Sequence, residues 1–500
     1  MDEGWATRAK RLPWAAIAVG GCLFLLLAAF VTADPANGAT FSSSPFSDEG
    51  FNTVNARNFV QLGRWSTDEW NLYLVNLPYS LLSVVAMKLL GTGIVAIRLV
   101  SIACVSATAL ALAWGLRRSL GTAWAAFAGL AFAGSGLVLY YGRLAYVEDL
   151  VVLGLTLGAL VVASSGRVTF RWGLVAGACF AVAIGAKPSA IFAVAGIWLA
   201  LVAAWGWRDG AMRRWLGGCA AAIVAFGVGW LLIVWLPNRD AVSMDIRIWA
   251  PVQLSLTPLG MARSLSSYVR GGSDGVIGWM LGPLLALGFA GLLSIVALRK
   301  RLDADQARLA VAAAGWVVLG IGVVVIASYR PNRYALPMAP GLAILAAIGL
   351  RLLAGRLAEL RGGVRLPVFR SIGTALAAVA IVVAVAPGLT RYYAWNQHAT
   401  SELPAIQDRM ANLVPEGELV AGRESGLFLM ESKATTLEVQ LTQQGTAANA
   451  GDLYARGVRW YVEPDTSAAP PGVPADVWGR RQSLACGRWG GMTECLYRLP

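Results

Sequence analysis

The sequence contains few charged residues. Only 14% of its 500 residues are Asp, Glu, Lys or Arg, whereas about a quarter of an ordinary globular domain is charged. The hydrophobic share is 57% and the mean hydropathy is +0.61, which excludes a water-soluble protein, a disordered chain, a collagen and a disulfide-rich secreted scaffold. Apolar stretches long enough to cross a bilayer recur instead, and they predict an all-α polytopic membrane protein.

Histidine is almost absent. His398 is the single histidine, which argues against a histidine-based metal site and against a Ser-His-Asp triad. The sequence also lacks a Gly-rich phosphate loop between a strand and a helix, so we do not expect a bound nucleotide.

We expect about eleven membrane spans, with boundaries good to a few residues. They cover residues 13–33, 94–116, 123–140, 149–163, 172–187, 191–207, 216–236, 277–298, 309–328, 335–350 and 372–389. The first span is expected to be an anchor, because it is too long for a signal peptide and lacks a small-residue cleavage site at its end.

Basic residues are concentrated in alternate connections between these spans. If the N-terminus is cytoplasmic, the cytoplasmic side holds 19 basic and six acidic residues, and the other side holds 22 of each. The whole formal net charge of +13 then follows from the positive-inside rule, and it does not indicate a nucleic acid partner. An odd number of spans places residues 390–500 on the extracytoplasmic side of the cell membrane.

The chain therefore divides into two predicted domains. Residues 1–389 form a transmembrane catalytic domain, and residues 390–500 form a small extracytoplasmic α/β domain, because strand-like and helix-like runs alternate there. Cys486 and Cys495 flank a turn rich in glycine within this exported part. We expect them to form a disulfide across a hairpin.

Residues 34–93 form a long outer loop with two helices of its own. Phe51, Val54, Phe59 and Leu62 fall on one helical arc of about 140°, which predicts an amphipathic helix in the membrane interface over residues 49–62. Residues 77–90 are apolar but too few to span comfortably, so we expect them to lie against the outer leaflet or dip into it.

Ionisable residues gather at the outer ends of the predicted spans: Asp48, Glu49, Arg143, Glu148, Asp149, Lys187, Arg330 and Arg333. Such groups are costly at membrane depth, and they tend to face a cavity or carry function. A carboxylate can accept the proton of an attacking hydroxyl, and fixed cations can stabilise a phosphate leaving group. The cluster is therefore suited to group transfer.

Five short motifs lie around these residues, in the order Phe46-Ser47-Asp48-Glu49-Gly50, Arg98-Leu99, Gly142-Arg143-Leu144-Ala145-Tyr146-Val147-Glu148, Gly185-Ala186-Lys187-Pro188 and Arg333-Tyr334-Ala335-Leu336-Pro337. Their order and sidedness resemble the GT-C superfamily of integral membrane glycosyltransferases. The branch in question contains the protein O-mannosyltransferases and the lipid A aminoarabinose transferase. The resemblance covers residues 10–390.

The resemblance implies roles for the outer residues. Asp48 would be the base that activates the acceptor hydroxyl, and Glu148 would be the second catalytic acid, with Glu49 and Asp149 as further catalytic candidates. Lys187 and Arg333 would contact the donor phosphate, and Arg330 and Arg143 complete that candidate set. Arg57, Arg64 and Arg143 are also expected to pair with the carboxylates.

The sequence departs from the family pattern at two places. Many relatives carry Asp where this chain has Glu148, and Asp149 follows directly, so it stays open which of the two faces the site. Asn76-Leu77-Pro78 stands where the family commonly has Lys-Pro-Pro or His-Pro-Pro. The acceptor therefore stays open between a protein, a lipid and a polysaccharide.

The expected function is inverting transfer of a sugar from a polyprenyl-phosphate donor to an acceptor hydroxyl. Nucleotide sugars stay in the cytoplasm, so a site on the outer face would use a lipid-linked sugar whose tail lies in the bilayer. No cofactor is expected, although a divalent cation at Asp48 and Glu148 is left open. The alternatives are a polytopic transporter or lipid flippase, and a receptor that acts through its exported part.

Each residue also has a purely structural alternative. Asp48 could cap the helix that follows it, and Glu148 or Asp149 could cap the fourth span. The ammonium group of Lys187 could extend to the lipid headgroups. Arg330 and Arg333 could bind those headgroups as well.

Overall fold

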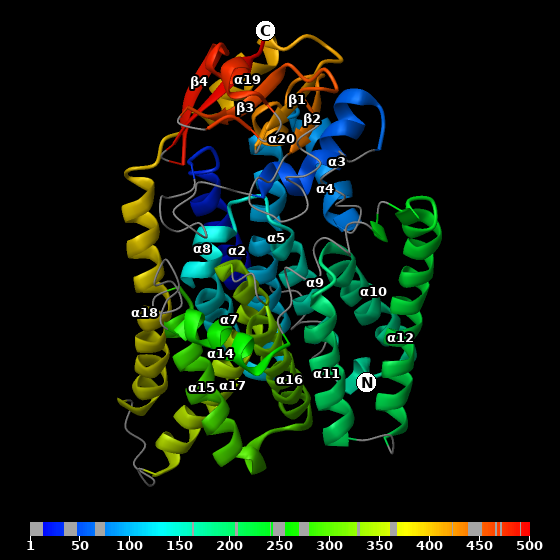
Figure 1. Cartoon of the computed structure of the whole chain (residues 1–500). Helices are drawn as coiled ribbons and strands as arrows, with labels where there is room; N and C mark the ends of the chain where they lie inside the picture. Colours follow the sequence, from blue (N-terminus) through cyan, green and yellow to red (C-terminus); the bar gives the residue numbers. More distant parts are fainter. Residues whose placement is uncertain are drawn as a thin grey trace.

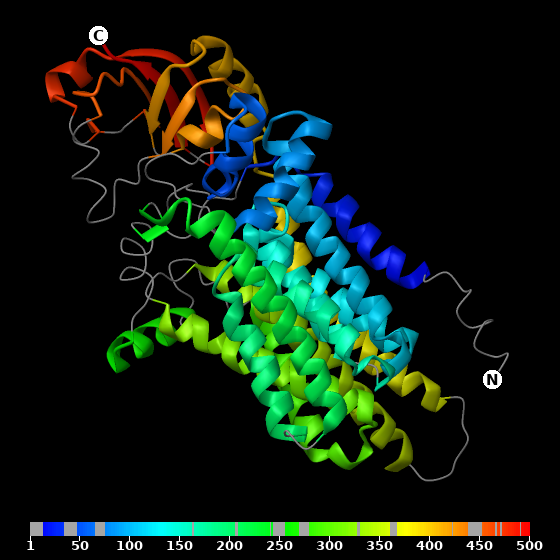
Figure 2. The ribbon, with the colours of Figure 1, turned by 90° about the vertical axis from the view of Figure 1, so that its right-hand side faces the viewer.

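The computed structural model is a helical bundle with a small sheet at one end (Figure 1, Figure 2). It describes residues 14–34, 48–65, 76–162, 165–205, 209–240, 242–243, 256–269, 280–327, 331–360, 368–422, 424–438, 453–465, 468–470, 473–490 and 492–500. The expected class, a mostly helical chain with a C-terminal α/β part, is what the structure contains.

A helix lies at the position of every predicted span. These helices are α2 (Trp14–Ala28), α5 (Ile94–Gly115), α7 (Thr122–Ala133) with α8 (Gly136–Tyr141), α9 (Val147–Val162), α10 (Phe170–Ala186), α11 (Ala190–Trp205), α12 (Gly210–Trp230) with the π-helix η3 (Leu231–Trp235), α15 (Gly282–Ala297), α16 (Ala304–Ile326), α17 (Ala339–Leu360) and α18 (Val368–Asn396). Within the described residues, five are long and apolar enough to cross a membrane, namely Ile94–Leu120, Gly210–Trp235, Ala304–Ile326, Asn332–Glu359 and Ala375–Asn396. The number of spans stays a prediction.

Shorter helices connect the long ones. They are α6 (Arg117–Leu120), η2 (Ser165–Arg167), α14 (Pro258–Val269), η5 (Arg299–Arg301) and η6 (Asn332–Met338).

Close backbone contact at glycine brings α11 and α16 together. A Cβ atom on Gly196 would lie 2.2 Å from the carbonyl oxygen of Gly315, and a Cβ on Gly315 would lie 2.1 Å from that of Gly196. Small residues let helices approach in this way where lipid provides no hydrophobic force between them. The backbones of α11 and α16 are therefore in direct contact at Gly196 and Gly315.

The predicted cytoplasmic connections meet at one end of the bundle. Arg351 Nη1 and Gln306 Nε2 both donate to the carbonyl oxygen of Ser119, at 3.1 and 2.8 Å. Arg301 forms an ion pair with Glu359 at 2.6 Å. Three of these connections thus lie together, and their cytoplasmic orientation remains a prediction.

Helix α3 (Glu49–Leu62) is not the interfacial amphipathic helix that the sequence predicts. Its residues from Glu49 to Asn58 are all buried, the polar ones included. Several of these polar side chains form hydrogen bonds inside the protein. Asn52 donates to the carbonyl oxygen of Ala145 at 3.2 Å. The following helix, α4 (Leu77–Leu90), exposes Leu81, Leu82, Val85, Leu89 and Leu90, as expected for a helix against the outer leaflet.

The C-terminal sheet has five strands in the order β2-β1-β3-β5-β4. The strands are β1 (Leu419–Gly422), β2 (Thr435–Glu438), β3 (Trp460–Pro464), β4 (Gln482–Trp489) and β5 (Met492–Arg498), and the helices beside them are α19 (Leu403–Leu413), α20 (Ser425–Phe428) and α22 (Ala475–Gly479). Strand β1 pairs in parallel with β2 and β3, whereas β5 pairs antiparallel with β3 and β4.

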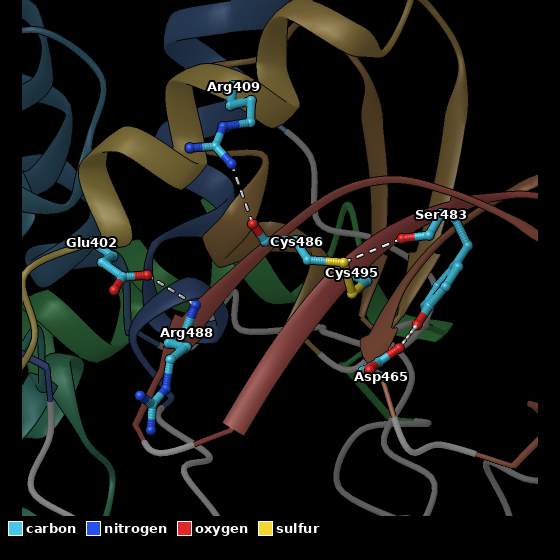
Figure 3. The surroundings of a disulfide bond; sticks show 8 residues. Glu402, Arg409, Asp465, Ser483, Cys486, Arg488 and Cys495 are labelled. Atoms are coloured by element: carbon cyan, nitrogen blue, oxygen red, sulfur yellow. Dashed lines mark hydrogen bonds between the residues drawn. A yellow bond between two sulfur atoms is a disulfide. The ribbon is translucent and has the colours of Figure 1, made fainter.

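The expected disulfide joins Cys486 and Cys495, which face each other across β4 and β5. Figure 3 shows its surroundings, where Arg409 donates to the carbonyl oxygen of Cys486 at 3.3 Å. The hydroxyl of Ser483 lies 3.2 Å from Sγ of Cys486.

The C-terminal part is packed onto the bundle by a shared core and by Arg57. Side chains of α3, α4 and α5 form one buried cluster with those of α19 and α20. Arg57 of α3 is fully buried and donates to the carbonyl oxygens of Leu429, Ser432 and Ala434 at 3.1, 2.7 and 2.7 Å. Helix α3 is therefore held between the bundle and the sheet (Figure 1).

Candidate active site

Four ionisable side chains from distant parts of the sequence meet in the helical bundle. Asp48 precedes α3, Glu148 lies in the first turn of α9, Lys187 ends α10, and Arg333 lies in η6. The side chains of Asp48, Glu148, Lys187 and Arg333 are 12%, 2%, 20% and 4% exposed. Charges so far from water are costly unless they are paired.

Arg333 is the centre of this cluster. Its Nη2 donates to Oδ2 of Asp48, and its Nε donates to Oε1 of Glu148 at 3.0 Å. Lys187 Nζ donates to the same Oε1 at 2.6 Å. Two cations and two carboxylates thus form one connected network.

Prolines help to set the local geometry of the two cations. Lys187 leaves the helix in an extended conformation, with φ −152° and ψ 116°, because the residue before Pro188 is disfavoured in the helical region. Arg333 lies in a short 3₁₀ segment between Pro331 and Pro337. Neither cation is placed by a long regular helix.

Aromatic rings cover both cations. Lys187 Nζ lies 3.9 Å from the centre of the Tyr334 ring, and Arg333 Cζ lies 4.8 Å from the centre of the Tyr146 ring. Such stacking favours a cation that has little water around it.

A pocket opens beside Glu148 and Lys187. Its lining includes these two residues and Tyr334, together with the apolar side chains of Ala193 of α11, Val323 of α16 and Met338 of η6. A pocket that combines charged and apolar lining residues suits a phosphate attached to a lipid chain.

Solved structures resemble the whole chain, although no protein-family model and no curated protein matches the sequence. ArnT from Cupriavidus metallidurans bound to undecaprenyl phosphate aligns with a TM-score of 0.63 and 15% identity, over 99% of this chain and 98% of that chain. The oligosaccharyltransferase AglB from Archaeoglobus fulgidus, in complex with an inhibitory peptide and a dolichol-phosphate, aligns with a TM-score of 0.57 and 11% identity, over 90% and 69%. The arabinofuranosyltransferase AftD from Mycobacteria aligns with a TM-score of 0.56 and 14% identity, over 97% of this chain and 41% of that chain.

These three proteins are GT-C superfamily glycosyltransferases. This protein has the GT-C fold. The resemblance inferred from five short motifs is therefore confirmed at the level of the fold.

Within the GT-C fold, Glu49 belongs to a different cluster from its neighbour Asp48. Arg98 donates from Nε and Nη2 to the two oxygens of Glu49, both at 2.7 Å, and the Ala145 N–H donates to Oε1 at 2.9 Å. Burial alone would raise the pKa of Glu49, but Arg98 and the Ala145 N–H more than offset it, so the pKa lies below its usual range. This geometry supports a structural role for Glu49 rather than the catalytic role expected from the sequence.

Glu148 and Asp149 point in different directions from the start of α9. Glu148 joins the Arg333 network, whereas Asp149 acts electrostatically on Tyr79 of α4 and Cys104 of α5. Asp149 is fully buried beside Ser101 of α5. The question that the sequence left open is thus answered by geometry in favour of Glu148 as the residue that faces the cluster.

The other predicted arginines lie elsewhere. Arg143 donates to the backbone carbonyl oxygens of Phe30, Ala33 and Asp34. It therefore binds the segment that follows α2 and does not join the Arg333 cluster. Arg64 donates to Thr435 at 3.0 Å, and Arg57 binds the C-terminal carbonyls described above. Arg330 lies outside the described residues.

The structural alternatives can be compared with these contacts. Asp48 occupies the N-cap position of α3, but its side chain makes no capping hydrogen bond. Lys187 and Arg333 turn inward to carboxylates rather than outward to headgroups. The contacts favour a site over the capping and headgroup alternatives.

The sequence motifs contain Arg98, Tyr146 and Tyr334, but the sequence assigned none of them a role in the site. The role of Arg98 could have been inferred, because an arginine within an apolar span needs a buried partner. No pattern in the sequence indicates that the rings of Tyr146 and Tyr334 stack on cations.

The donor set leaves little room for a divalent cation at the predicted position. The guanidinium of Arg333 lies between Asp48 and Glu148, where a bridging metal ion would have to sit. Across the described ranges, no group of three or more His, Cys, Asp and Glu side chains is arranged to hold a metal ion. The cofactor expectation stays a prediction.

Proposed function

We propose that this protein is a glycosyltransferase that moves a sugar from a polyprenyl-phosphate donor to an acceptor hydroxyl at the outer face of the membrane. The observation that carries the proposal is the buried network of Asp48, Arg333, Glu148 and Lys187 beside a pocket with apolar walls. The GT-C fold supports it, since ArnT is solved with undecaprenyl phosphate and AglB with a dolichol-phosphate.

The donor would bind with its phosphate at Lys187 and Arg333. Lys187 gives one of its three ammonium hydrogens to Glu148, so it can also donate to a phosphate oxygen. The lipid chain would follow the walls formed by Ala193 and Val323. Because Gly196 and Gly315 close the α11–α16 seam, the chain would leave the pocket sideways into the bilayer.

Asp48 would then act as the general base. Arg333 engages Oδ2, so Oδ1 is the oxygen that would accept the proton. The acceptor hydroxyl would give its proton to Asp48 while its oxygen bonds to the anomeric carbon. The bond from that carbon to the phosphate oxygen breaks, and its electron pair stays on the phosphate. Lys187 and Arg333 would stabilise the developing charge, and attack from the opposite face inverts the configuration.

Glu148 would hold the two cations in place. It accepts from both Lys187 and Arg333, and without it the two positive charges would repel each other. Its role in this scheme is electrostatic and positional.

Mass spectrometry of the purified protein tests the proposal. We expect the wild-type protein to retain a polyprenyl phosphate or its sugar-linked form, and the double variant Lys187→Ala, Arg333→Ala to lose it. Arg64→Ala is the matched control, because Arg64 lies on the outer face and binds Thr435. Equal lipid retention by all three proteins would remove both cations from the donor site.

A further inference from the structure

Tyr146 is held rigidly between the parts that form the site. Its carbonyl oxygen accepts from Ser101 Oγ of α5 at 3.3 Å, and its N–H donates to Leu144 at 2.8 Å. The preceding residue, Ala145, is bound by Glu49 and Asn52 of α3. The backbone that carries the phenol ring is therefore held by α3 and α5.

The ring of Tyr146 contacts the central cation of the network. Its centre lies 4.8 Å from Cζ of Arg333, and its edge meets the ring of Tyr141 with centres 5.8 Å apart. The charged groups that act most strongly on the phenol are those of Arg333, Asp48 and Glu49. The hydroxyl thus belongs to the same electrostatic environment as the proposed base and the proposed phosphate ligand.

The hydroxyl of Tyr146 makes no hydrogen bond in the described structure. The side chain is fully buried, and its oxygen has no partner among the described residues. A buried hydroxyl without a partner destabilises a fold, so each case calls for an explanation. Phenylalanine would fill the same volume and stack on Arg333 without this cost.

We propose that the Tyr146 hydroxyl donates a hydrogen bond to a phosphate oxygen of the lipid-linked donor. The inference rests on the proposed function and adds a neutral donor to the two cations. A neutral hydroxyl can bind the phosphate without placing a third positive charge beside Lys187 and Arg333. The hydroxyl has no partner to give up among the described residues when the lipid binds. The new hydrogen bond is therefore not offset by the loss of another one within the protein.

Tyr146→Phe tests this assignment because it removes one oxygen and keeps the ring over Arg333. The probe is undecaprenyl phosphate, titrated against the delipidated full-length protein in detergent. We expect the variant to bind it about 10- to 100-fold more weakly, as for the loss of a hydrogen bond to a charged group. The melting temperature of the lipid-free variant should be equal to or above that of the wild type.

Tyr461→Phe is the matched control. Tyr461 lies in β3 of the C-terminal sheet, and its hydroxyl is also buried without a partner in the described residues. This variant should bind the lipid like the wild type and should not melt lower. If the Tyr146 hydroxyl had a merely structural role, Tyr146→Phe would lower the melting temperature and leave the affinity for the lipid unchanged.

The possible outcomes separate this inference from the proposed function. If the wild type binds undecaprenyl phosphate and Tyr146→Phe binds it equally well, the hydroxyl does not contact the phosphate. If the wild type binds none, the donor class is wrong and the proposed function falls together with this inference. If Tyr146→Phe binds the lipid more weakly and Tyr461→Phe does not, the result supports both this inference and the proposed function.

Discussion

Arg333 engages one carboxylate oxygen of Asp48, although the two residues are 285 positions apart in the sequence. This ion pair places a cation directly beside the proposed base. The ion pair uses a single oxygen of Asp48, so the other can accept a proton. A bidentate pair, as between Arg98 and Glu49, would leave the carboxylate much less basic.

Arg333→Lys should lower turnover and weaken donor binding, because a single ammonium group replaces a planar guanidinium group. Arg333 reaches Asp48 and Glu148 from two different nitrogens, and lysine cannot reproduce this geometry. We expect a loss in kcat on the order of 10²-fold. Arg64→Lys, on the same face but bound to Thr435, serves as the control. Full activity of Arg333→Lys would contradict the proposed geometry.

Glu49→Gln should reduce stability, because it leaves the buried Arg98 without a full counter-charge. Breaking a buried ion pair from one side costs about 3 kcal/mol, and the pair here is 0% exposed on both sides. The measurement is the shift in melting temperature in detergent. Glu402→Gln, at an exposed carboxylate that accepts from the Arg488 N–H, should melt close to the wild type. A wild-type melting temperature for Glu49→Gln would show that the pair contributes no net stability.

Asp34 should make stability fall as the pH rises from 4 to 6. Burial raises the pKa of Asp34 from 3.8 to about 6, although the Thr400 hydroxyl and Arg98 partly oppose the shift. The folded state then binds a proton that the unfolded state has already released, so the stability that Asp34 contributes is greatest below about pH 4 and is lost as the pH passes 6. Two pKa units correspond to about 3 kcal/mol.

Asp34→Asn should remove this slope, because the amide stays neutral at every pH. Melting curves between pH 4 and 7 test the point, and Asp476→Asn, at an exposed surface position, is the control. Parallel curves for Asp34→Asn and the wild type would mean that the carboxyl of Asp34 titrates normally.

The membrane orientation can be tested at exposed positions. In a variant that lacks Cys22, a cysteine at Arg480 should react in intact cells with an impermeant reagent, and one at Arg213 should react only after lysis. Both positions are exposed, whereas Asp48, Glu148 and Arg333 are too buried for labelling. Labelling of position 213 in intact cells would show that the predicted orientation is wrong.

The sequence predicted the helical class and the outer cluster because hydropathy and charge are local properties. Runs of apolar residues indicate helices. The sequence also places Asp48, Glu148, Lys187 and Arg333 at the ends of predicted spans, and the structure brings these four residues together. The sequence did not predict that α3 is buried, because the partners of Arg57 lie more than 370 residues further along the chain. Hydrophobic periodicity cannot show that a polar helix face will be covered by another part of the chain.

The division of roles between adjacent acidic residues also required the structure. Asp48 and Glu49 are consecutive, as are Glu148 and Asp149, and neighbouring helical side chains point about 100° apart. Which member of each pair faces Arg333 depends on the rotation of α3 and α9 against α5 and η6. That rotation is set by contacts such as those of Glu49 with Arg98 and Ala145.

The most direct test of the central claim is single-turnover release of polyprenyl phosphate from the lipid-linked sugar that co-purifies with the protein. Asp48→Asn keeps the shape of the side chain and removes its basicity. We predict that it lowers the rate on the order of 10²–10⁴-fold while the variant still retains the lipid. Turnover at the wild-type rate by Asp48→Asn would contradict the assignment of Asp48 as the base, and with it the glycosyltransferase mechanism proposed for this site.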